Sequence, residues 1–523
     1  MTTTPSSRRG RRRSGPRATA SHPVTRSAVV LFLAAIAPAA WAQGTTLRMT
    51  LEADAGATTN ATGAPQGSER VDQVTSLRPA LQVTSQTRLL KLDARVGAYA
   101  TVYARGLQPD RVVPAVSADA TATVVERLLF VDASVSSRAA ERDPYAARSD
   151  PASTQNQAVV SVYRLSPHID QDLADGSSVH ARFEEIVSHS GSDSASDQRF
   201  ANSDLHVTRR PEPFGGTISF ETHAIHYAYP ADSAWKIETL KASGDVALGG
   251  EFVVGPSIGT ERTELLLDKQ RDSLYGLHML WTPGERTRLA IEAEHRFFGT
   301  GWQAEFTHRM PWLTFSVRWD RAPVTDSQSL GVASSGSALS GFLDAILTTR
   351  YPDATARAAV VDAIVANRGL QGNLQGAIDV RTDYVQLQNR LDAEAVFMGS
   401  RNIMAVGVYM LTSRALTVPG DELQSALAGS ADSRQVGASL DFNRKLEPEL
   451  TLDFNATWSR ITSLLSGASQ ASIDESYRLA LVRALSARTS AAMGLRHDAL
   501  RTNLTTLDSY SATSAYVGMT HKF

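Results

Sequence analysis

The chain of 523 residues contains no cysteine. This absence excludes disulfides, thiolate metal sites, a cysteine nucleophile and a lipoprotein anchor, and it suits a chain that crosses an oxidising periplasm unfolded. Long apolar runs are also missing after the N-terminal region, because no later stretch approaches the roughly 20 apolar residues that a membrane helix needs. If the chain lies in a membrane, it must therefore cross that membrane as strands.

Acidic residues are missing from the N-terminal region. Seven arginines precede an apolar run from Ala28 to Ala40 and the small-residue site Ala40-Trp41-Ala42. This order predicts a secretory signal peptide over residues 1–42, because the apolar run is too short to span a bilayer. Without those seven arginines, 45 basic residues face 54 acidic ones, so residues 43–523 carry a net charge of about -9. Such a chain has no electrostatic footprint for nucleic acid.

Catalytic and metal-binding signatures are missing as well. The sequence has no G-x-S-x-G, no H-E-x-x-H, no phosphate-binding glycine loop and no nucleotide fingerprint. His168, His180, His223 and His226 follow no catalytic motif, so we expect ordinary turn and lumen residues there. The acidic loop 193–197 lacks the spacing and the glycine of a calcium loop. We therefore expect no enzyme, no cofactor and no metal site.

Strict alternation of apolar and polar residues is the strongest pattern that is present. In the segment 450–459, Leu450, Phe454 and Trp458 share one face of an extended strand, and polar residues such as Asn455 share the other. Short connections alternate with long polar ones, and no linker divides the chain. One-sided turns and loops are typical of outer-membrane barrels. The sequence therefore predicts an all-β fold: one large, closed, antiparallel transmembrane β-barrel of about 22 strands, within a range of about 18 to 24.

The C-terminus supports a location in the cell outer membrane. The chain ends on Phe523, and Met519, Val517 and Ala515 lie on the same face of the last strand. This arrangement resembles the terminal signal by which the barrel assembly machinery recognises outer-membrane barrels, although His521 stands where an apolar residue is more usual. The expected partners are thus that machinery and the outer-membrane lipid.

The inner face of two predicted strands carries the residues that a lumen would present. On the strands 287–296 and 384–397, alternation turns a mixed set of charged and amide side chains inward: Arg288, Glu292, Glu294, Arg296, Gln386, Gln388, Arg390, Asp392 and Glu394. Charges of both signs favour neutral polar solutes such as sugars, or ion pairs that brace the wall, over a strongly charge-selective pore. A filled interior that these residues merely solvate is an equally open interpretation.

One segment departs from the strand pattern. Between 321 and 376, two apolar stretches at helical spacing flank Pro352-Asp353, with Asp353 as the predicted cap of the second helix and Gly369 as its end. We expect a helical hairpin that leaves the barrel from its outer rim and buries an apolar stripe. The residues of this candidate plug are Phe342, Ile346, Val361 and Ile364. A plug or gate inside the lumen and an outward-facing docking element both fit the pattern.

Several stretches carry a more particular likeness. They are Trp281-Thr282-Pro283-Gly284-Glu285-Arg286-Thr287, Glu294-His295-Arg296-Phe297-Phe298-Gly299-Thr300, Phe306-Thr307-His308-Arg309 and, earlier, residues 127–133 and 163–167. Together with the helical insert, they resemble the PEP-CTERM system-associated outer-membrane proteins, which are found with exosortase and exopolysaccharide loci. The resemblance implies an outer-membrane partner of such an envelope system, in contact with exopolysaccharide export components.

Two classes of function stay open at this point. The chain is either a conduit or gated pore for polysaccharide or neutral polar solutes, or a non-conducting barrel that displays loops and a helical hairpin to a partner.

Overall fold

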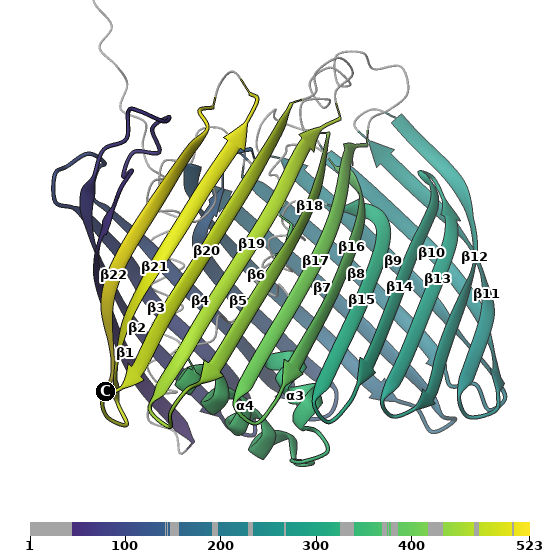
Figure 1. Cartoon of the computed structure of the whole chain (residues 1–523). Helices are drawn as coiled ribbons and strands as arrows, with labels where there is room; N and C mark the ends of the chain where they lie inside the picture. Colours follow the sequence, from purple (N-terminus) through teal and green to yellow (C-terminus); the bar gives the residue numbers. More distant parts are fainter. Residues whose placement is uncertain are drawn as a thin grey trace, which may run out of the picture.

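The structure, a computed structural model, shows a wall of inclined strands that closes on itself (Figure 1). It describes residues 44–141, 143, 145–146, 156–190, 197–227, 234–265, 268–324, 339–368, 374, 376–377, 385–416, 432–464, 470–504 and 507–523. The predicted signal peptide, residues 1–42, lies outside these ranges.

The alternating segments of the sequence form 22 strands. The first eleven are β1(Thr45–Thr58), β2(Asp72–Gln86), β3(Leu90–Tyr103), β4(Arg111–Val125), β5(Leu129–Glu141), β6(Gln157–Asp172), β7(Ser177–Ser190), β8(Gln198–Arg209), β9(Phe214–Tyr227), β10(Ala234–Leu248) and β11(Phe252–Leu265). The others are β12(Asp268–Gly284), β13(Thr287–Arg296), β14(Gly299–Arg309), β15(Leu313–Val324), β16(Gln386–Met398), β17(Asn402–Ala415), β18(Ser433–Lys445), β19(Leu450–Ser463), β20(Ala471–Ala484), β21(Thr489–Thr502) and β22(Tyr510–Lys522).

The sheet has no free edge. Each strand pairs in antiparallel register with its neighbours in sequence, and β1 also pairs with β22 from Thr50↔Lys522 to Thr58↔Ser514. Closure satisfies the backbone groups of every strand inside the sheet, which lipid requires because it offers no hydrogen bonds. The predicted closed antiparallel barrel of about 22 strands is therefore confirmed.

The two ends of the barrel differ in their connections. The end that holds the C-terminus carries links of two to four residues, such as 126–128, 285–286 and 446–449. The opposite end carries the long connections, although the links 266–267 and 297–298 are short there too. In outer-membrane barrels the short turns and both termini lie in the periplasm. We therefore name these two ends the periplasmic end and the outer end.

The two faces of the wall differ in polarity. Large apolar side chains such as Ile258, Leu277 and Val517 are exposed on the outside, where lipid would cover them. Inner-face positions are polar, as at Glu261 and Gln386. Near the periplasmic turns, the exposed tryptophans Trp281 and Trp312 match the aromatic girdle expected at a membrane interface. This is the surface of a transmembrane barrel of the outer-membrane type.

Two helices interrupt the strands between β15 and β16, namely α3(Leu339–Leu347) and α4(Ala354–Arg368). The carboxylate of Asp353 accepts a hydrogen bond from the Ala356 amide at 2.7 Å, so this residue caps α4 as its position in the sequence predicts. In the part of the chain that the structure describes, no helix has the length and apolarity needed to cross a membrane.

Candidate functional site

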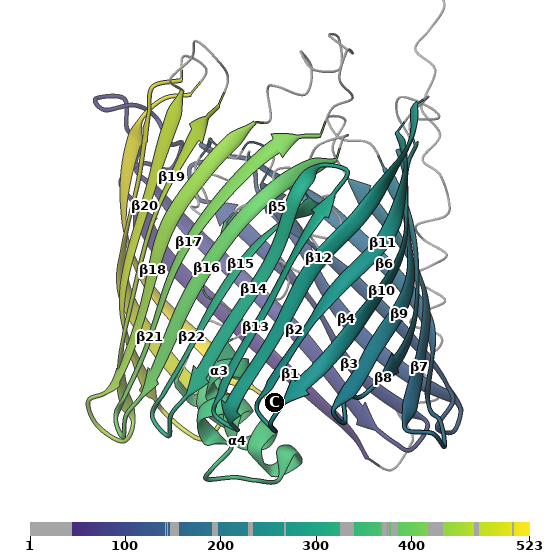
Figure 2. The same cartoon turned by 90° about the vertical axis from the view of Figure 1, so that its right-hand side faces the viewer.

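The helical insert leaves the wall at the outer end but packs at the periplasmic end. β15 continues through Val324, which pairs with Gln386, so the insert starts later than the expected residue 321. Both views place α3 and α4 at the end of the short turns (Figures 1 and 2). There they contact Val396 and Ile403, on either side of the turn 399–401. The two helices thus lie at the end of the barrel opposite to the one where β15 ends and β16 begins.

The apolar side chains of the two helices form one buried cluster with the inner wall. Phe342, Leu343, Ile346 and Val361 are buried in it, and the partly buried Ile364 packs against it. The inner-face row that begins with Gln386 and Gln388 continues past Glu394 to Val396 and Met398, and this apolar end of the row is where the helices pack. We call this group the hairpin–wall cluster. Its members are Leu339, Phe342, Leu343, Ile346, Leu347, Val361, Leu374, Val396, Ile403 and Ala405.

An ion pair ties the two helices together. The Nε of Arg357 on α4 donates to Oδ1 of Asp344 on α3 at 2.7 Å. The same guanidinium donates to the carbonyl oxygens of Tyr351 and Pro352 at 2.9 and 3.1 Å. Because one side chain binds α3, α4 and the turn between them, the hairpin is one unit.

The described residues that follow α4 also lie on the inner wall. Leu374 is buried in the hairpin–wall cluster, and a Cβ built on Gly407 of β17 would lie 3.9 Å from the Leu374 Cβ. A Cβ on Gly376 would lie 3.5 Å from a terminal nitrogen of Arg390 on β16. Leu374 therefore lies against β17 and Gly376 against β16.

By register, the nine residues predicted to face the lumen share the inner face. Arg288 pairs with Glu305 at 3.1 Å, and Arg390 pairs with Asp392 at 2.6 Å. The Gln386 Oε1 accepts from the Ser413 hydroxyl at 2.5 Å, and Gln388 donates to that same Oε1 at 3.4 Å. The charges that the sequence turns inward thus find partners along the wall.

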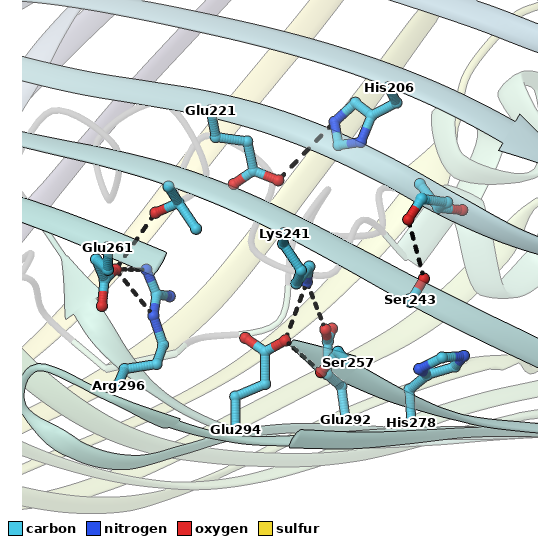
Figure 3. A network of polar contacts seen from close by, with 12 residues as sticks. His206, Glu221, Lys241, Ser243, Ser257, Glu261, His278, Glu292, Glu294 and Arg296 are labelled. Atoms are coloured by element: carbon cyan, nitrogen blue, oxygen red, sulfur yellow. Dashed lines mark hydrogen bonds and ion pairs between the residues drawn. The ribbon is translucent and has the colours of Figure 1, made fainter. Parts of the chain in front are cut away.

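A lysine that sequence reasoning missed binds two of these residues (Figure 3). Lys241 on β10 donates to Glu292 at 2.8 Å and to Glu294 at 3.1 Å, although both carboxylates belong to β13. The Ser257 hydroxyl adds a hydrogen bond to Glu294 at 3.1 Å. Gly276 makes this reach possible, because a Cβ there would stand 2.7 Å from the Glu294 Cγ.

The fourth predicted residue of that strand, Arg296, pairs with Glu261 of β11, which is 0% exposed. Besides this guanidinium, Glu261 accepts from the Thr239 hydroxyl and from the Phe297 amide, each at 3.3 Å. A buried carboxylate needs such a full set of donors, because desolvation otherwise makes its charge too costly. This network braces the wall where Figure 3 shows it.

Four histidines alternate with four carboxylates across β5 to β9. His168 contacts Asp132 and Asp170 at 3.3 and 3.4 Å. His180 contacts Asp170 and Asp204 at 2.5 and 3.4 Å. The row continues through His206, which lies 3.2 Å from Asp204 and 3.9 Å from Glu221, to His223, 3.9 Å from Glu221.

His168, His180 and His223 thus lie on the lumen side of the wall, and together with His206 they form a row that the sequence interpretation did not anticipate. Signals for it were present at strand spacing, in His168-Ile169-Asp170, Asp204-Leu205-His206 and Glu221-Thr222-His223. Among the described residues, no group of histidine and acidic side chains has a geometry that could hold a metal ion.

Parts of the lumen are open to solvent. Lys91, Asp93 and Arg95 point inward from β3 and are exposed. A cavity of about 210 Å³ lies beside the β1–β22 seam, with Arg78 and Tyr516 in its lining. In contrast, a cavity of about 100 Å³ near the outer end is lined both by Phe200 and Trp235 and by Pro323 of β15. Side chains from well-separated strands thus approach one another there, and the lumen narrows.

The residues of the predicted assembly signal lie on the last strand. By register Ala515, Val517 and Met519 point outward, and the side chains of Val517 and Met519 are exposed. Phe523 follows the strand, and its amide donates to the Met49 carbonyl of β1 at 2.9 Å. Its ring lies edge-on to His521, with centroids 4.6 Å apart.

Comparison with known proteins finds likeness in solved structures alone. No protein-family model matches the chain, and no curated protein matches it. The siderophore receptor PirA from Acinetobacter baumannii is 10% identical over 92% of this chain and 81% of that chain, with a TM-score of 0.45. The FrpB iron transporter from Neisseria meningitidis is 10% identical over 91% and 82%, with a TM-score of 0.48. The unliganded ferric citrate transporter FecA is 8% identical over 91% and 78%, with a TM-score of 0.46. At these values the likeness assigns no ligand to this chain.

Proposed function

We propose that this outer-membrane barrel is a gated conduit for polysaccharide or neutral polar solutes. Its gate is the helical hairpin 339–368. The observation that carries the proposal is the packing of the hairpin on inner-wall residues at the periplasmic end, although the insert starts from the outer end. A docking element displayed at the outer rim would not need this burial inside the barrel.

The inner wall suits an uncharged polar solute. Many of its charges are paired along the wall, as Lys241 is with Glu292 and Glu294, so the lumen presents charges of both signs rather than a field of one sign. Exposed inner residues such as Lys91 and Arg95 keep part of the lumen accessible to water. In the same proposal the barrel serves an exopolysaccharide system of the PEP-CTERM type and contacts its export components, as its sequence motifs suggest.

Removal of the hairpin tests the gate. We expect a variant that lacks residues 338–369, with the flanks joined, to fold as a heat-modifiable barrel and to show higher single-channel conductance in planar bilayers. It should also admit larger sugars in liposome swelling assays. A deletion variant that folds but conducts no better than the parent would exclude the gate and favour the alternative, a non-conducting barrel that presents the exposed side of α4 to a partner.

A disulfide lock provides a second, reversible test. Leu374→Cys with Gly407→Cys would place two Cβ atoms about 3.9 Å apart, within the usual range for a disulfide. Because the chain has no cysteine, no other pairing competes. We expect the oxidised protein to lose open-channel events and to regain them on reduction. The two single-cysteine variants are the matched controls, and both should be insensitive to oxidant.

A further inference from the structure

The outward surface of β10, β11 and β12 carries charge near the outer end. Six residues in two cross-strand rows form this patch. One row pairs Lys236 with Glu264 and Glu264 with Lys269, and the other pairs Glu238 with Arg262 and Arg262 with Arg271. We call these six residues the rim patch. They point to the lipid side, because Trp235 and Ile237, which alternate with Lys236, are buried on the inner face.

The rim patch holds more positive than negative charge. Lys236 lies 2.5 Å from Glu238, Arg262 lies 2.9 Å from Glu264, and Lys269 lies 3.2 Å from Glu264. Arg271 donates to the Thr260 hydroxyl at 3.1 Å and forms no ion pair with a described side chain. The rim patch thus contains four cations and two carboxylates. Exposed ion pairs contribute little stability, so wall stability alone does not account for the excess cations.

The position of the rim patch matches one lipid headgroup layer. On β12, Arg271 and Trp281 both point outward and lie ten residues apart. At about 3.3 Å per residue and a tilt of about 40°, ten residues rise about 25 Å, which is the height of the apolar band of such barrels. Trp281 lies at the periplasmic interface, so Arg271 lies at the outer one. Charge there costs little, whereas at the bilayer centre it costs about 2 to 4 kcal/mol.

An exposed apolar strip runs directly below the rim patch. Leu240, Ile258, Tyr275 and Leu277 follow the same strands toward the periplasmic end, and all four side chains are exposed. Cations above an apolar strip are complementary to a lipid whose phosphates lie at the membrane interface and whose acyl chains lie along the wall.

We propose that the rim patch binds a diphosphorylated glycolipid of the outer leaflet. Arg262 and Arg271 provide planar forks that suit phosphate oxygens, Lys236 and Lys269 add charge at the edges, and the apolar strip contacts the acyl chains. Glu238 and Glu264 hold the basic side chains apart and in place. This site is independent of the conduit, because it lies on the other face of the wall.

Native mass spectrometry of the full barrel in detergent tests the site, with diphosphorylated lipid A as probe and the same lipid without phosphates as comparison. We expect the phosphorylated lipid to bind at least about tenfold more tightly, and Arg262→Gln with Arg271→Gln to remove about tenfold of that affinity. The matched control is Lys91→Gln with Arg95→Gln, which removes the same charge from the lumen and should leave binding unchanged.

Two results would overturn the proposal. The first is equal affinity for the two lipids in the unaltered protein, which needs no variant to fold. The second is an equal loss in the rim and lumen variants, which would mean that the lipid responds to net charge and not to this patch.

Discussion

Glycines on the inner face let long side chains lie flat against the wall. A Cβ on Gly437 of β18 would stand 2.4 Å from the Cζ of Tyr409, its partner on β17. A Cβ on Gly494 would stand 2.6 Å from the Tyr516 hydroxyl oxygen, which accepts from Arg478 at 2.8 Å. Glycine weakens a strand, but here the neighbouring ring covers it and keeps the lumen clear.

This packing predicts the effect of a single methyl group. Gly437→Ala should lower the free energy of unfolding by about 1 to 3 kcal/mol, because the Tyr409 ring has to move. Equilibrium unfolding in urea from lipid vesicles measures the loss. In a Tyr409→Ala background the same substitution should cost little, since the ring is gone. An equal cost in both backgrounds would rule out the contact as the cause.

At this scale the sequence shows which face a side chain occupies but not which partner it meets. Alternation suffices to assign Glu292 and Glu294 to one face of their strand. Their partner Lys241 lies on β10, and that contact depends on the register of the strands between and on Gly276. Register is a property of pairs of strands, so a single sequence does not contain it directly.

At the scale of elements, prediction was accurate where one pattern dominates. β13 runs from Thr287 to Arg296, the predicted bounds, because apolar and polar residues alternate there without interruption. The two helices were also predicted from apolar spacing and from the Asp353 cap. The position of the helices in the barrel was not predicted. The apolar part of the wall against which they pack is short, and it is formed by Val396 and Ile403 on two different strands.

The two faces of one strand should respond oppositely to the same charge. Phe454→Arg on β19 would place a guanidinium in lipid, at a cost of about 2 to 4 kcal/mol near the bilayer centre. Asn455→Arg would place it in the lumen beside Asp441, to which Asn455 now donates at 2.6 Å. We expect slower and less complete folding into vesicles for the first variant alone, measured by heat modifiability on gels. Similar defects in both variants would contradict the assignment of faces.

At the scale of the whole molecule, closure joins residues that are as far apart in sequence as the barrel allows. β1 and β22 meet along nine paired positions, and the Phe523 amide adds a hydrogen bond to Met49 at the periplasmic end. The sequence predicts a closed barrel with an even number of strands and a C-terminal strand with an assembly signal, and both are consistent with this seam. It does not predict that His521, unusual for an assembly signal, packs edge-on against the Phe523 ring and contacts the Thr489 hydroxyl at 2.9 Å.

Deletion of Phe523 distinguishes its role in recognition by the assembly machinery from its role in the stability of the folded barrel. The deletion removes one backbone hydrogen bond of the seam, worth about 1 kcal/mol, while nine paired positions remain. Refolding of the purified chain into detergent should therefore stay nearly normal. In cells, we expect a strong loss of heat-modifiable protein from the outer membrane, because the assembly machinery would no longer recognise the last strand. Normal assembly in cells would show that Phe523 carries no signal, and a matching loss in detergent would show that it acts through the seam alone.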